Sequence, residues 1–97
     1  SAVYKGLAAG AGVKVSVLYF ARLREALGIQ REDLALPEGV ASVAALRAHL
    51  RQRGGAWETE LAADRPVRIA VNQDIAAPDT PLCNGDEVAV FPPVTGG

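Results

Sequence analysis

Hydrophobic and polar residues alternate along the stretch VKVSVLYF, from Val13 to Phe20, and this alternation predicts the first strand. The odd-numbered positions are all apolar or aromatic and form one face. The opposite face begins polar and becomes apolar toward its end, at Leu18 and Phe20. A strand with this pattern is either central in its sheet or part of an interface.

Alternation also predicts three later strands, at Asp33–Leu36, Val67–Asn72 and Glu87–Phe91. In the last of these, Ala89 and Phe91 share the face opposite to the valines. Turn-forming residues separate the strands, namely Pro37-Glu38-Gly39, Asn72-Gln73-Asp74 and Asn84-Gly85. Ile75 follows one of these turns and has no obvious place in a core.

Two segments have helical periodicity. Ala21–Leu27 contains good helix formers and is followed by Gly28, which suits a left-handed helix end. The main helix is predicted at Ser42–Arg53, with Ser42 as its N-cap and Gly54-Gly55 after its end. The stretch from Trp57 to Arg65 is mixed in character and predicts no regular element.

This order of elements predicts an α+β fold, in which one main helix crosses a mixed sheet. It is the outline of a β-grasp, or ubiquitin-like, fold. We expect residues 13–91 to form the domain, residues 1–12 to be a flexible leader, and residues 92–97 to be an extended tail.

The expected tail combines two prolines, which stiffen the backbone, with two terminal glycines, which have no side chain. Pro92 and Pro93 favour an extended backbone, and Val94 and Thr95 lead to Gly96-Gly97. Because glycine has no Cβ, an enzyme can close tightly around the last two residues. At about 3.3 Å per residue, the tail can reach roughly 20 Å into a partner and deliver the carboxylate of Gly97.

Composition excludes several classes of function. The formal net charge of −1 and the lack of a basic stripe argue against nucleic-acid binding. No apolar run reaches the length of a membrane span, and we expect a cytoplasmic protein. Cys83 is the only cysteine and His49 the only histidine, so we expect no metal site and no disulfide within the chain.

Three stretches resemble the small subunit of molybdopterin synthase, a family of ubiquitin-like sulfur carriers. They are VKVSVLYFARLRE from Val13, AVNQD from Ala70, and NGDEVAVFPPVTGG from Asn84 to Gly97. The terminal FPPVTGG is specific to that family, whereas a bare Gly-Gly would not be.

The resemblance implies that the chain binds no cofactor and is not catalytic alone. An adenylating enzyme of the ubiquitin-activating type would use ATP to activate the carboxylate of Gly97. A sulfur donor would then convert it into a thiocarboxylate. The tail, with Gly96 in the narrow channel, would enter the large synthase subunit. Two successive sulfurs would convert a cyclic pyranopterin monophosphate into the dithiolene of molybdopterin, in a complex of two carriers and two large subunits.

We expect Phe20, Ile75 and Phe91 to form one apolar patch beside the tail and to contact the partner. Arg24 is a candidate for a polar contact at its border. Along the tail, Pro92, Pro93, Val94 and Thr95 are expected to set register and stiffness in the partner's channel. The alternative is that the aromatic residues fill a second part of a small core.

Three other functions share this fold. A sulfur carrier for thiazole synthesis also ends in Gly-Gly, and the FPPVTGG tail argues against it. A ubiquitin-like protein modifier would join Gly97 to lysines of other proteins. A non-covalent interaction module would have an inert tail.

Overall fold

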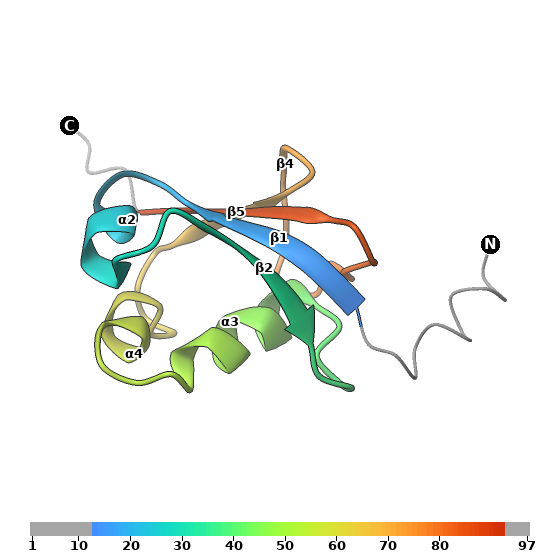
Figure 1. The fold of residues 1–97 in the computed structure, drawn as a ribbon, viewed down its shortest axis with the longest axis horizontal. Coiled ribbons are helices and arrows are strands. Elements are labelled where there is room, and N and C mark those ends of the chain that lie inside the picture. The colour runs from blue at the N-terminus through green and yellow to red at the C-terminus, as the bar shows by residue number, and fades with distance from the viewer. Residues whose placement is uncertain (1–12, 93–97) are drawn as a thin grey trace, which may run out of the picture.

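The computed structural model describes residues 13–92, which form one five-stranded mixed sheet with helices on one side and at one end (Figure 1). The strand order is β2-β1-β5-β3-β4. The central pair, β1 and β5, is parallel, and the other neighbours are antiparallel. The strands are β1 (Val13–Tyr19), β2 (Arg31–Leu36), β3 (Arg68–Val71), β4 (Asp74–Ile75) and β5 (Glu87–Phe91).

The described part of the chain has three helices, α2 (Ala21–Leu27), α3 (Val43–Arg51) and α4 (Ala56–Glu60). Ser42 is the N-cap of α3, and its Oγ accepts a hydrogen bond of 3.2 Å from the backbone N–H of Ala45. Gly28 ends α2 in the left-handed conformation, with φ at 74°. Within residues 13–92, no helix is long and apolar enough to cross a membrane.

The core lies between the sheet and α3, as the alternation predicts. Val15, Val17 and Tyr19 of β1 are almost fully buried, together with Val88 and Val90 of β5. From α3, the apolar stripe Val43, Leu46 and Leu50 packs against this face. Every residue classed as buried in the described part of the chain is apolar or aromatic. We call this helix-covered side the inner face and the opposite side the outer face.

Several predicted boundaries differ from the structure. Strand β1 ends at Tyr19 rather than Phe20, and β3 covers Arg68–Val71 rather than Val67–Asn72. Strand β2 begins at Arg31 rather than Asp33, because its antiparallel ladder with β1 extends to the pair Leu18 and Arg31. The main helix ends at Arg51 instead of Arg53. The C-cap residue Gln52 donates its N–H back to the carbonyls of His49 and Leu50, and Arg53 turns toward β2.

Two short elements were missed. The stretch that begins at Trp57 was expected to have no regular structure, but it contains most of α4. Hydrogen bonds from Arg47 of α3 fix the loop that follows α4. The Arg47 guanidinium donates hydrogen bonds to the carbonyls of Leu61, Ala62 and Arg65. The two residues of β4 extend the turn after β3 into a hairpin. A two-residue strand is too short for periodicity to reveal.

Candidate functional site

The ends of β1 and β5 bring two aromatic side chains together on the outer face. Phe91 ends β5, and Phe20 follows β1 directly. Their rings are stacked, with centroids 4.8 Å apart and planes inclined by 11°. The N–H of Phe20 donates to the carbonyl of Val90 at 3.2 Å, which continues the parallel pairing beyond Tyr19. Phe20 remains 36% exposed, so the pair lies at the surface rather than in the core.

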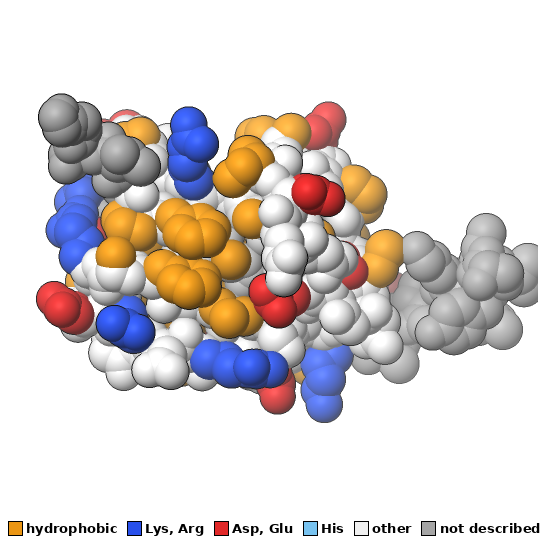
Figure 2. Space-filling model, turned by 90° about the horizontal axis from the view of Figure 1, so that it is seen from above, with side chains coloured by type: hydrophobic (Ala, Val, Ile, Leu, Met, Phe, Trp, Pro, Cys, Tyr) orange, Lys and Arg blue, Asp and Glu red, His pale blue; other side chains and the backbone are white. Residues whose placement is uncertain are grey.

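A row of apolar side chains crosses the outer face beside this pair. In the sheet register, Leu18 of β1 lies opposite Ala89, Ala89 lies opposite Ala70, and Ala70 lies opposite Ile75. Paired residues point to the same side of a sheet, so all four share the outer face. Ile75 is 65% exposed. The outer-face patch comprises Leu18, Phe20, Ala70, Ile75, Ala89 and Phe91, and Figure 2 shows hydrophobic side chains gathered on this side of the molecule.

The structure therefore places Phe20, Ile75 and Phe91 on one face of the sheet. Phe20 and Phe91 are in contact, whereas Ile75 lies on β4 at the far end of the apolar row, and their contact with a partner stays a prediction. Arg24 is exposed on α2, one helical turn after Phe20. Pro92 is half-buried at the end of the described part. The predicted tail residues Pro93, Val94, Thr95, Gly96 and Gly97 lie outside the described residues.

Three members of the patch were not predicted as site residues. Leu18 could have been predicted from the sequence, because the outward face of β1 becomes apolar at that position. Ala89 was predicted to share the face of Phe91, but alanine is common in every environment, and neither Ala89 nor Ala70 was singled out as a site residue. Their place depends on the pairing of β3 with β5, which strand periodicity alone does not specify.

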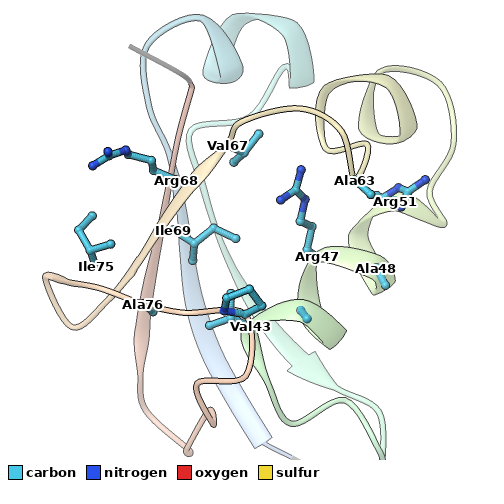
Figure 3. Close-up of a pocket in the computed structure, with 12 residues that line it drawn as sticks. Val43, Arg47, Ala48, Arg51, Ala63, Val67, Arg68, Ile69, Ile75 and Ala76 are labelled. Carbon is cyan, nitrogen blue, oxygen red and sulfur yellow. The ribbon is translucent and has the colours of Figure 1, made fainter.

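A groove of about 490 Å³ lies between α3 and the β3–β4 hairpin (Figure 3). Arg47 and Arg51 of α3 line one side of it, and Arg68 and Ile75 lie on the other. Its lining contains no acid, histidine, cysteine or hydroxyl group. The groove therefore lacks the groups needed for acid–base or nucleophilic chemistry.

A polar cluster closes the other edge of the inner face, and sequence reasoning missed it. Arg53 donates to both carboxylate oxygens of Glu32, at 2.8 and 3.0 Å, and the Tyr19 hydroxyl donates to Glu32 at 2.7 Å. The Arg53 guanidinium lies 4.4 Å from the centre of the Trp57 ring, which meets Tyr19 edge-on.

The pKa values in this cluster follow from its contacts. Burial alone would raise the pKa of Glu32, but the hydrogen bonds from Arg53 and Tyr19 outweigh it and lower that pKa below its ordinary value. Burial, together with Glu32, raises the pKa of Tyr19 far above its ordinary value. The hydrogen bond to Glu32 raises the pKa of Arg53. These groups keep their charge states near neutral pH, so the cluster serves structure.

Metal ligands are likewise not assembled in the described part of the chain. Residues 13–92 contain no group of three His, Cys, Asp or Glu side chains placed to hold a metal ion. Cys83 is half-buried in the turn before β5, where its N–H donates to Asp86. What the described surface offers is a contact area beside the end of β5.

Sequence comparison shows what this arrangement resembles. The model of the ThiS family matches residues 17–97. The molybdopterin synthase sulfur carrier subunit of Escherichia coli strain K12 is 42% identical over 83 residues, which are 86% of this chain and 99% of that protein. The protein of the same name from Haemophilus influenzae is 39% identical over equal shares.

Solved structures agree in fold. A putative molybdopterin converting factor subunit 1 from Pyrococcus furiosus has a TM-score of 0.72 and 40% identity, over 86% of this chain and all of that one. Small archaeal modifier protein 1 from Haloferax volcanii has a TM-score of 0.73 and 27% identity, over the same shares. A chain in the complex of subunits 1 and 2 of molybdopterin-converting factor from Helicobacter pylori 26695 has a TM-score of 0.61 and 27% identity, over 88% of this chain and all of that one.

The family model spans most of the chain, and the curated relatives match over nearly their whole length. The chain therefore belongs to the ThiS family, among relatives that are molybdopterin synthase sulfur carrier subunits.

Proposed function

We propose that this chain carries sulfur for a molybdopterin synthase as a thiocarboxylate on Gly97. The outer-face patch docks on the large subunit and the tail delivers the sulfur into that subunit's active site. The carrier works in the cytoplasm, where ATP and reducing thiols are available. It supplies no general base and binds no cofactor of its own.

The proposed loading has two stages. The carboxylate of Gly97 attacks the α-phosphate of ATP, which forms an acyl adenylate and releases pyrophosphate. A persulfide of the sulfur donor then attacks the acyl carbon and displaces AMP, and a thiol cleaves the sulfur–sulfur bond to leave the thiocarboxylate. Adenylation is needed because a free carboxylate is a poor electrophile and lacks a leaving group.

One observation carries this proposal. Strand β5 ends inside the outer-face patch, where Phe20 and Ile75 are exposed, so any chain that continues from Phe91 leaves the domain directly beside a surface fit for docking. A carrier needs a docking surface and a delivered group on the same side of the molecule. The names of the closely matching relatives support molybdopterin synthase over the thiazole pathway.

Intact mass spectrometry tests the loading chemistry. The chain is incubated with ATP, an adenylating enzyme of the ubiquitin-activating type and a persulfide sulfur donor. We expect a mass gain equal to the exchange of one oxygen for one sulfur atom. A matched variant that lacks Gly97 should show no gain. An unchanged mass for the full chain, with both enzymes active on a known carrier, would contradict the proposal.

A second function is favoured by one comparison. In this function, which the similarity to small archaeal modifier protein 1 supports, Gly97 is joined to lysine side chains of other proteins. Such an amide bond survives reducing agents. Adducts of higher mass that persist under reduction, and that disappear when Gly97 is removed, would favour this function over sulfur transfer.

A further inference from the structure

Charge is unevenly distributed on the outer face of the sheet. At the end that carries the patch, Arg31 of β2 lies opposite Leu18, and Arg68 of β3 lies opposite Phe91. At the other end, Asp33 and Glu87 both lie opposite Ser16 of β1. On this one face, both acids lie in the row of Ser16, Arg31 lies in the next row beside Leu18, and Arg68 lies in the row after that beside Phe91.

The two arginines border the patch on opposite sides. Strands β1 and β5 lie between β2 and β3, so three strand spacings separate the two backbones, or roughly 15 Å. Leu18 and Phe91 lie on the strands between them. Figure 2 shows Lys and Arg side chains at the border of the hydrophobic cluster.

Arg31 and Arg68 are also available for an external partner. Both are exposed, and neither forms an ion pair or side-chain hydrogen bond with another residue of the range 13–92. In contrast, Arg22, Arg51, Arg53 and Arg65 each lie within ion-pair distance of a glutamate. A guanidinium without such a partner can bind a carboxylate in bidentate geometry.

We propose that Arg31 and Arg68 form an arginine frame that orients the large synthase subunit on the patch. The matching surface of that subunit is an apolar depression with carboxylates on two opposite sides. Two charge contacts on either side of an apolar centre fix the line along which the partner lies across the strands. A quarter-turn of the partner would move one carboxylate away from its arginine and toward Asp33 and Glu87, where like charges repel. This inference rests on the proposed function and names the chemistry of its partner surface.

The test measures association of the carrier with the large subunit of its own molybdopterin synthase. Arg31→Glu, Arg68→Glu and the double variant are compared with wild type at about 0.01 M and about 1 M salt, where the Debye length falls from about 30 to about 3 Å. Lys14→Glu is the matched control, because Lys14 is exposed on the same face beyond Ser16. Circular dichroism checks that each variant is folded.

We expect the double variant to associate on the order of tenfold more slowly at low salt, with the difference shrinking at high salt. The neutral pair Arg31→Gln and Arg68→Gln should lie between this variant and wild type. Lys14→Glu should stay within about twofold of wild type.

Three results would overturn the arginine frame. If the double variant associated at the wild-type rate, the arginine frame would be disproved. The proposed function would still stand if Phe91→Ala weakened the complex. An equal loss for Lys14→Glu would show a net-charge effect and would also disprove the frame. No complex with the wild-type chain would overturn the frame and the docking part of the proposed function together.

Discussion

Both faces of the central strand pair carry large apolar side chains, but only those of the inner face are fully buried. On the inner face, Val17 and Val88 are fully buried beneath the helices. On the outer face, Phe20 and Phe91 stack on each other and Phe20 stays 36% exposed. The difference lies in what covers each face.

This contrast separates stability from recognition. Apolar area that is buried in folding stabilises the monomer, at about 25 cal/mol per Å². Apolar area that is left exposed stabilises a complex, because only association removes it from water. Mutations on the inner face should therefore change unfolding, and those on the outer face should change binding.

The largest expected effect is on the inner face. Leu46→Ala removes a side chain of α3 that is 1% exposed, and the cavity that remains should lower the free energy of unfolding by about 2–5 kcal/mol. Urea unfolding at neutral pH measures this loss. Binding of the large subunit by the folded protein should stay within about twofold of wild type. A weakened complex with unchanged stability would reverse the assignment of the two faces.

Phe91→Ala should have the opposite effect, with a larger loss of binding than of stability. Removal of the stacked ring should weaken binding of the large subunit by about 2 kcal/mol, or about thirtyfold in Kd, with a smaller loss of stability. Titration calorimetry with the large subunit gives the affinity, and Leu46→Ala is the matched control. Unchanged affinity would place Phe91 among the residues that serve only the fold.

Glu32→Gln tests the polar edge of the inner face. The carboxylate accepts hydrogen bonds from Arg53 and Tyr19, so we expect a loss of about 1–2 kcal/mol at neutral pH with binding unaffected. Because the folded-state pKa of Glu32 is lowered, its stabilising contribution is present above the unfolded pKa of about 4.3. That contribution is lost as pH falls through the folded-state pKa.

Urea unfolding across the acid range checks this sign. The wild-type protein should lose stability more steeply than Glu32→Gln as pH decreases through and below about 4. Parallel curves for the two proteins would show that Glu32 does not titrate differently in the folded and unfolded states.

The smallest expected effect is at Ile75, which sharpens the border of the patch. This side chain is 65% exposed, so Ile75→Ala should leave the free energy of unfolding nearly unchanged. Binding of the large subunit should weaken by about 1 kcal/mol, or about fivefold. A loss of stability larger than the loss of binding would show that Ile75 closes the groove beside α3 rather than the patch.

Local pattern was sufficient for most of the fold. Ala21–Leu27 and Glu87–Phe91 were predicted with the bounds that the structure has, because helix formers before Gly28 and strict alternation are strong signals. Helix α4 was not predicted. Its five residues are stabilised by contacts that come from distant parts of the sequence, including the Trp57 ring against Tyr19.

The candidate site was predicted only in part, for a similar reason. The strand faces of the predicted fold pointed to Phe20, Ile75 and Phe91, and the structure places these residues on one face. Arg31 and Arg68 gave no signal, since charged residues at strand ends are ordinary surface residues. Their positions opposite Leu18 and Phe91 depend on strand pairing between segments far apart in the chain.

By itself, the sequence determined the longer strands and helices and which face of each is apolar, because side-chain alternation and capping act between near neighbours. Only the tertiary structure decided which apolar face would be covered. Placing α3 on one side of the sheet buries Val17 and Val88 and leaves the outer-face patch open in the described structure. That choice depends on how the whole chain packs.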